Sequence, residues 1–379
     1  SAASRQVPPM HEDSDIQRIA RLTPLADVLA SFDLAIAPVA PREEMLSKAT
    51  GLALAADVIA RSGHPRSALA LRDGFAVRSE ETLDASSYAP AALSAAPVRI
   101  DAGEPLPQGA DAVAPIDAVQ KRGAMAEALS AVAPDEGVLL PDTDAAAGLK
   151  LRLGGAALRR IDVALLAALG VERVMVRQPR ARVVCETAGT VAASAAALIA
   201  SAIDAEGGSA ITQGTTLEAA LSDDTADAVV AIGGTGSGRS DSSVKTLARL
   251  GKVTCHGVAI APGETTAIGA VGARPVLLLP GRADAALAGW LTIGRRMLAR
   301  LAFRLIEDQP FAAELGRKVT SSLGLAEVVP VRRRLARVEP VAAGYLPLQS
   351  LIKAEGWILV PADSEGYPQG ARVVVRPWP

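Results

Sequence analysis

Apolar residues recur along this chain either at helical spacing or in short strand-like runs. Each change from one pattern to the other predicts a domain boundary. Residues 16–61 and 143–177 both show apolar positions at helical spacing together with short strand-like runs. Residues 62–142 consist of short apolar runs broken by glycine and proline, which predicts an inserted β-rich domain. The two flanking segments share the order of helix followed by strand, so we group them as one discontinuous linker domain.

The second half of the chain predicts two further domains. Residues 178–307 alternate apolar runs with amphipathic helices, which is typical of a doubly wound, mainly parallel sheet. Residues 308–379 return to short strands and turn residues, so we expect a C-terminal β domain. The predicted fold class is α/β plus β. Near the N-terminus we expect a helix over 24–36 with Thr23 as its N-cap, and a short helix over 43–51.

Composition excludes several classes of function. The 379 residues carry a net charge of −2, which gives no electrostatic footprint for nucleic acid, and we interpret Arg332, Arg333 and Arg334 as a solvated strand face. Cys185 and Cys255 form no C-x-x-C pair, which argues against a zinc or disulfide framework. The first 15 residues lack an apolar signal-peptide core, and no apolar run is long enough for a membrane span. We therefore expect a cytoplasmic protein that binds neither nucleic acid nor membrane.

Three loops of the predicted parallel domain are candidates for ligand binding, because ligands of such sheets lie beyond the carboxyl ends of strands. The loop 233–238 (GGTGSG) leaves backbone N–H groups open to an anion, or else is a tight turn that requires glycine sterically. The loop 280–282 (PGR) offers Arg282 to a phosphate, unless that arginine faces solvent. The loop 186–190 (ETAGT) offers hydroxyls and one carboxylate.

Other polar residues allow two interpretations. Asp73 with Gly74 is either a turn or a metal-binding carboxylate. His64 is interpreted as a loop residue. His256 is expected near a strand end in a structural role, because spacing identifies no catalytic partner for it.

Five segments, in order, resemble the MoeA and gephyrin E-domain family over nearly the whole chain. The longest of them are RIDAGEPLPQGADAVAPIDAV, HGVAIAPGETTAIGAVGARPVLLLPGRADAAL and GWILVPADSEGYPQGARVVV; the shorter ones are ALALRDGFAVRSEET and AIGGTGSGRSD. The resemblance implies a MoeA-like multidomain fold, with a doubly wound molybdopterin-binding (MogA-like) domain, the inserted β domain and the C-terminal β domain. It also implies a homodimer, and a molybdoenzyme or cofactor-biosynthesis protein as a further partner.

The family reaction inserts molybdate into adenylylated molybdopterin with a divalent metal. The ligand implied here is therefore a phosphorylated pterin, molybdopterin or adenylyl-molybdopterin, with Mg²⁺. Carried over by motif, Asp73 and Asp142 are the candidate catalytic residues, and Asp73 and Asp241 the candidate metal ligands. The candidate pterin-binding residues are Thr187, Gly233, Gly234, Thr235, Gly236, Ser237, Gly238, Asp241, Pro280, Gly281 and Arg282.

Several positions depart from the family pattern. Ala261 and Glu264 stand where the family has two lysines, Ala102 replaces a threonine, and Glu186 begins a loop that lacks the family's acidic pair. Each lost charge-assisted contact costs roughly 1.5–3 kcal/mol, and Glu264 repels an anion. The favoured hypothesis is a MoeA-like protein that binds molybdopterin with impaired or altered molybdate insertion.

Two alternatives remain open at this point. One is an active Mg-dependent molybdotransferase in which Asp73, Asp142 and Asp241 hold the metal and arginines replace the lysines. The other is a non-enzymatic assembly or scaffold protein for a molybdoenzyme.

Overall fold

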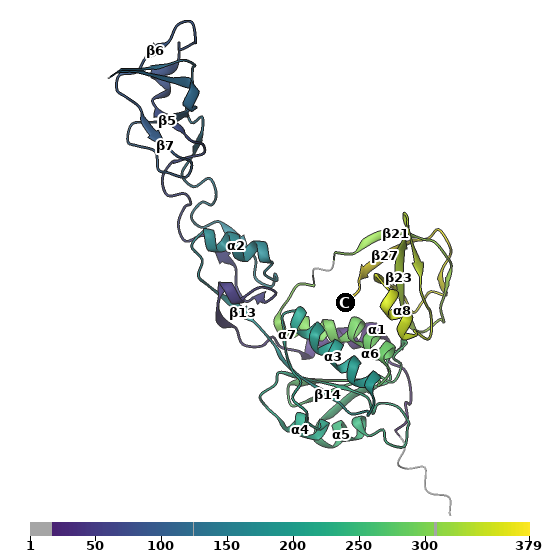
Figure 1. Ribbon diagram of the computed structural model, residues 1–379. Helices are drawn as coiled ribbons and strands as arrows, with labels where there is room; N and C mark the ends of the chain where they lie inside the picture. The colour runs from purple at the N-terminus through teal and green to yellow at the C-terminus, as the bar shows by residue number, and fades with distance from the viewer. Residues whose placement is uncertain (1–16, 124, 307–308) are drawn as a thin grey trace, which may run out of the picture. The chain divides into compact units, whose positions relative to one another are not determined.

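The computed structural model describes residues 17–123, 125–306 and 309–379, and the chain divides into two compact units (Figure 1). The insertion unit comprises residues 57–153 and 164–172. Of the described residues, the main unit comprises 17–56, 154–163, 173–306 and 309–379. The helix α2 (Arg160–Ala168) contributes residues to both units.

The regular structure of the insertion unit consists mainly of short antiparallel strands joined by turns and loops, as its glycine- and proline-broken pattern predicts. Two three-stranded sheets, β7-β5-β8 and β6-β10-β9, each bury small apolar side chains. Two strand pairs, β4–β11 and β3–β12, complete the unit. The bounds are β3 (Val58–Ile59), β4 (Leu69–Ala70), β5 (Gly74–Val77), η3 (Ser79–Thr82), β6 (Ala91–Ala92), β7 (Val98–Ile100), β8 (Ala112–Ala114), η4 (Ile116–Ala118), β9 (Val119–Arg122), β10 (Met125–Ala128), β11 (Val138–Leu139) and β12 (Lys150–Arg152).

The N-terminal part of the main unit corrects two predictions. The helix α1 (Leu25–Ala35) begins after Pro24, and the Thr23 side chain does not cap it. Instead, Thr23 is extended: its N–H donates to the carbonyl of Gly257, and its carbonyl accepts from the N–H of Ala259.

The helix predicted over 43–51 is a strand followed by a single 3₁₀ turn. The strand β1 (Arg42–Met45) precedes η2 (Leu46–Lys48). It pairs antiparallel with β13 (Arg173–Arg177), which also pairs with β2 (Ala53–Leu54). Pairing with a strand about 130 residues away overrides the local helical preference, which is a weak influence by comparison.

A six-stranded sheet forms the centre of the main unit, in the order β15-β14-β16-β20-β19-β17. The first four strands pair parallel, whereas β19 pairs antiparallel with both β20 and β17, so the sheet is mainly parallel as predicted. The strand bounds are β14 (Arg180–Cys185), β15 (Ser209–Ile211), β16 (Ala228–Ile232), β17 (Lys252–His256), β19 (Ala267–Val271) and β20 (Arg274–Leu279).

Helices cover both faces of this sheet (Figure 1). One face packs against α1, α3, α6 and α7, and the other against α4 and α5. Successive strand residues point to opposite faces, so Val183 joins the first core and Val184 the second. The helix bounds are α3 (Thr190–Ala205), α4 (Leu217–Ser222), α5 (Ser243–Leu250), α6 (Ala283–Gly289), the π-helical segment η5 (Trp290–Gly294) and α7 (Arg295–Ala302).

The C-terminal residues form a barrel-like β domain, in agreement with the predicted second β domain. Its sheet has the order β18-β23-β24-β21-β27-β25, and β23 also pairs with β25. The bounds are β18 (Ile260–Ala261), β21 (Phe311–Leu315), β22 (Val319–Thr320), β23 (Ala326–Arg334), β24 (Arg337–Pro340), α8 (Leu348–Lys353), β25 (Gly356–Val360), β26 (Gly366–Tyr367) and β27 (Arg372–Pro377). No helix in the described part of the chain is both long and apolar enough to cross a membrane.

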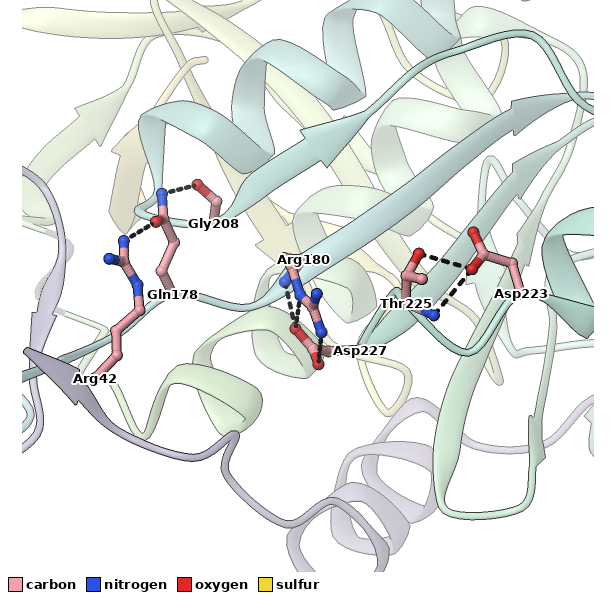
Figure 2. A network of polar contacts seen from close by, with 7 residues as sticks. All are labelled: Arg42, Gln178, Arg180, Gly208, Asp223, Thr225 and Asp227. Atoms are coloured by element: carbon pink, nitrogen blue, oxygen red, sulfur yellow. Dashed lines mark hydrogen bonds and ion pairs between the residues drawn. The ribbon is translucent and has the colours of Figure 1, made fainter.

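Polar side chains tie down the amino ends of the central strands (Figure 2). The Arg180 guanidinium and backbone N–H both donate to Asp227, which immediately precedes β16. Asp223 accepts hydrogen bonds from the hydroxyl and the N–H of Thr225 and pairs with Arg182. These contacts lie at the opposite strand ends from the predicted ligand loops.

The Asp223 carboxyl generates a testable prediction. Hydrogen bonds from Thr225, aided by the nearby Arg182 charge, lower the pKa of Asp223 to about 2. A carboxyl with a lowered folded-state pKa stabilises the fold at pH values above its unfolded pKa, and this contribution is lost as pH falls through the folded value. Asp223→Ala is therefore expected to lower the free energy of unfolding at pH 7, with the difference from wild type shrinking between about pH 4 and pH 2.

Denaturant unfolding across this pH range measures that difference. Asp224→Ala is the matched control, because Asp224 is exposed and makes no hydrogen bond or ion pair with the described residues. A loss of stability for Asp223→Ala that stays constant down to pH 2 would contradict the assignment.

Candidate functional site

Three loops meet at one edge of the central sheet because they follow three adjacent parallel strands. The strand β14 ends at Cys185, β16 at Ile232 and β20 at Leu279, and these strands are neighbours in the sheet. The loops enclose a cavity of about 590 Å³, which we call the loop cavity. Its lining comes from residues 187–192, 234–236, 241, 265 and 280–282.

Beside the loop cavity, the loops touch at glycine residues. Gly233 has φ +100°, and a Cβ added there would lie 1.9 Å from Oγ1 of Thr187. A Cβ on Gly281 would lie 3.2 Å from the same hydroxyl oxygen. The three loops therefore contact each other through glycine backbone and the Thr187 side chain.

Hydroxyl and carboxylate groups hold the glycine-rich loop in shape. The Ser243 hydroxyl donates to the carbonyl of Gly233 at 2.8 Å, and the Thr235 hydroxyl lies 2.9 Å from that of Thr265. The Asp241 carboxylate accepts from the N–H of Gly238 at 2.8 Å. Asp241, predicted as a metal ligand, therefore uses one oxygen to close the loop.

The amino end of α3 also faces the loop cavity. This 16-residue helix starts at Thr190 with Gly189 as its N-cap, and no side chain caps it. Uncapped N–H groups and the helix dipole favour an anion at such an end. The sequence predicts this helix but not the exposure of its amino end to the cavity.

Arg282 reaches the loop cavity, but a carboxylate already neutralises it. Two of its guanidinium nitrogens donate to Asp284 at 3.1 and 2.5 Å, and the guanidinium lies 5.0 Å from the centre of the Tyr345 ring. Asp284 is only 3% exposed and also accepts from the N–H of Leu346. Hydrogen bonding to Asp284, together with the charges of Asp284, Tyr345 and Glu264, raises the pKa of Arg282. Arg282, which the sequence predicts to bind a phosphate, is thus held in an ion pair with Asp284.

The substituted positions have structural partners of their own. The Glu264 carboxylate accepts from the N–H of Gly263 at 3.1 Å. Ala261 lies in β18 and pairs with Glu327 of β23. The Glu186 carboxylate accepts from the N–H of Leu217 at the start of α4, whose N-cap is Thr216.

The candidate catalytic residues of the insertion unit also make local contacts. The Asp73 carboxylate accepts from the N–H of Ala102 at 2.9 Å. Asp142 has φ +64°, and its carboxylate lies against Gly63, where a Cβ would approach within 1.5 Å. Among the described residues, no group of three or more His, Cys, Asp or Glu side chains could hold a metal ion.

Gln17 and His256 lie outside the cavity lining and bind backbone carbonyls of the glycine-rich loop. The sequence did not predict the role of Gln17. Gln17, 7% exposed, donates from Nε2 to the carbonyls of Gly234 and Gly236 at 3.0 and 2.9 Å. Its Oε1 accepts from the N–H groups of residues 244 and 245 at the start of α5. His256, predicted in a structural role, lies with Nε2 2.8 Å from the carbonyl of Thr235. No local pattern marks Gln17, because its partners are more than 200 residues away.

Family models match nearly the whole described chain. The model of the MoeA N-terminal region (domain I and II) matches residues 21–170. The model described as "Probable molybdopterin binding domain" matches residues 169–300, and that of the MoeA C-terminal region (domain IV) matches residues 312–378.

Individual relatives agree with these models. The chain is 27% identical over 325 residues to molybdopterin molybdenumtransferase 2 of Mycobacterium tuberculosis, covering 73% of this chain and 78% of that protein. It is 34% identical over 160 residues to a Methanocaldococcus jannaschii protein named "Putative molybdopterin biosynthesis protein", covering 42% of this chain and 38% of that relative.

Solved structures share the fold across almost the full length. A molybdopterin biosynthesis MoeA protein of Pyrococcus horikoshii superposes with a TM-score of 0.79 at 22% identity, covering 94% of this chain and all of that one. A second structure of that name and source gives 0.77 at 26% identity, covering 95% and 100%. With the three family models matched in order along the chain, this protein belongs to the MoeA family and is a MoeA-like molybdenum cofactor biosynthesis protein.

Proposed function

We propose that this chain binds molybdopterin in the loop cavity, with molybdate insertion altered relative to its family. The observation that carries this proposal is the composition of the cavity: backbone N–H groups, hydroxyls and the open amino end of α3 surround it. Such groups bind a phosphate ester through dipoles, as helix amino ends and glycine-rich loops do in many proteins. The hydroxyl of Thr187, an exposed residue of the lining, orients the ligand.

The charges around the loop cavity argue for altered insertion. Asp241 and Arg282 are the charged residues of the described lining, and Arg282 is already paired with Asp284. The negative charge of Glu264 interacts electrostatically with Arg282, so it is a further negative charge near the cavity. A dianion such as molybdate, or a second phosphate, meets no unpaired cation from these residues and is disfavoured by Coulomb repulsion.

A divalent metal would supply the missing positive charge. The fit is incomplete: among the described residues there is no cluster of three candidate ligands, and one oxygen of Asp241 already accepts from the N–H of Gly238. We therefore derive no step through a metal. The residues of this chain hold the phosphate and fix the orientation of the pterin.

A titration of the purified protein tests this function. We expect molybdopterin to bind, and adenylyl-molybdopterin to bind at least about tenfold more weakly, because its second phosphate meets the charges described above. AMP release is expected to be slow or undetectable with Mg²⁺ and molybdate present. Calorimetry gives the affinity, and chromatography of released AMP gives turnover.

The other outcomes select the alternatives. Rapid Mg-dependent AMP release would establish an active molybdotransferase and overturn the proposal of altered insertion. Failure to bind either pterin, together with stable capture of a purified molybdoenzyme, would favour a scaffold role instead.

Restoring a family cation tests the charge argument. Glu264→Lys removes one negative charge and adds one positive charge near the cavity, and a charge-assisted contact contributes about 1.5–3 kcal/mol. We expect adenylyl-molybdopterin to bind about 10- to 100-fold more tightly to this variant. Glu365→Lys is the matched control, since the Glu365 side chain is exposed and its carboxylate contacts none of the described residues. Equal gains in both variants would show a nonspecific charge effect.

We also propose a homodimer, which is what the resemblance to the family implies. The insertion unit supports this with large leucines that remain exposed: Leu140, Leu149 and Leu153 are 42%, 48% and 56% exposed. Sedimentation equilibrium is expected to give twice the chain mass of 38.7 kDa. Leu149→Glu should weaken association, whereas Leu335→Glu, in the fully exposed turn after β23, should leave it unchanged. A monomer at all concentrations would contradict the dimer.

A further inference from the structure

Three consecutive carbonyl groups of the glycine-rich loop are held by side chains that lie outside the loop cavity. Gln17 binds the carbonyls of Gly234 and Gly236, and His256 lies 2.8 Å from the carbonyl of Thr235. A carbonyl oxygen can only accept, so Nε2 of His256 carries the hydrogen. Neither side chain belongs to the lining of the cavity. The side chains that hold these three carbonyls therefore lie outside the cavity lining.

Peptide geometry converts this arrangement into a direction for the N–H groups. In a trans peptide the C=O of one residue and the N–H of the next point in opposite directions, and the described cis bonds lie elsewhere, at Pro65 and Pro262. The N–H groups of Thr235 and Ser237 are thus turned away from Gln17, and that of Gly236 is turned away from His256. Within the described part of the chain, none of these three groups donates to a protein acceptor.

The Gln17 side chain uses all of its hydrogen-bonding positions to hold the glycine-rich loop and the start of α5. An amide side chain offers two donor hydrogens and one oxygen with two lone pairs, and all of these positions are used. Extended backbone then anchors the segment that carries Gln17, through the hydrogen bonds of Thr23 with Gly257 and Ala259. The segment before α1 is therefore fixed against the main unit at Thr23 and against the glycine-rich loop at Gln17.

We propose that Gln17 and His256 are positioning residues that aim the amides of Thr235, Gly236 and Ser237 at the phosphate of the ligand. These three amides take over part of the anion binding that the replaced lysine positions, Ala261 and Glu264, cannot supply. The inference rests on the proposed function for the identity of the ligand, but the orientation of the amides is a property of this chain alone.

Gln17→Glu separates the two halves of the Gln17 contact. A carboxylate still accepts from the N–H groups at the start of α5, where the helix dipole favours a negative charge, so the fold is retained. It cannot donate to the carbonyls of Gly234 and Gly236 and repels them. His256→Leu removes the other donor, and His256→Gln restores an N–H near the same position.

The test is a titration of the isotopically labelled full chain with inorganic phosphate, followed by NMR shifts of the loop amides. In the wild type, the amide signals of Thr235, Gly236 and Ser237 are expected to shift and saturate. We expect phosphate affinity at least about tenfold weaker in Gln17→Glu and His256→Leu, and substantial recovery in His256→Gln. Gln349→Glu, an exposed site on α8, is the charge-matched control.

The inference would be overturned if the loop amide signals of the wild type did not shift on addition of phosphate. Equal phosphate affinities in Gln17→Glu and the wild type would also overturn it. If Gln17→Glu lowers the melting temperature, the comparison of His256→Leu with His256→Gln decides the question. A parallel titration with molybdopterin keeps the two proposals apart. Phosphate binding without molybdopterin binding would refute the proposed function and leave the positioning role intact.

Discussion

The parallel pairing of β14, β16 and β20 is the constraint on which the site depends. Val183 pairs with Val230, and Val230 with Leu277, so the three strands are in fixed register and end at one edge. Burial on both faces enforces this register, because a slip by one residue would exchange the side chains of the two cores. Once the strands are fixed, their loops must converge, and close approach leaves room only for glycine at Gly233.

The loop cavity relies on backbone dipoles more than on side-chain charge. The charged groups in and near it are occupied by neighbours: Asp241 closes the glycine-rich loop, Asp284 holds Arg282, and Glu186 accepts from the first N–H of α4. Amide groups are neutral and rigidly placed, so they bind a phosphate with directional preference but do not cancel its charge. A site made of neutral amides suits a single phosphate, whereas a site that binds several anions needs positive side chains. The loss of the family's two lysines is therefore consistent with the altered molybdate insertion that we propose.

Sequence patterns predicted the architecture and the convergence of the three loops, but several local details were wrong. The predicted helix over 43–51 is strand β1, because pairing with β13 outweighs local propensity. Thr23 pairs with the chain near Val258 and does not cap α1. Arg282 was a candidate phosphate ligand, and the structure places its guanidinium against Asp284, two residues further on. The spacing of these two residues is visible in the sequence, but it does not distinguish a ligand from an ion pair.

The sequence by itself determined the class of each domain, the order of the elements and the loops that follow the parallel strands. These features depend on the period of apolar residues and on glycine, which act over a few neighbouring positions. Only the tertiary structure decided that α3 opens onto the cavity, that Glu186 and Asp284 are already engaged, and that Gln17 supports the glycine-rich loop. Such contacts join residues far apart in the chain, and a single polar side chain carries no local pattern that identifies its distant partner.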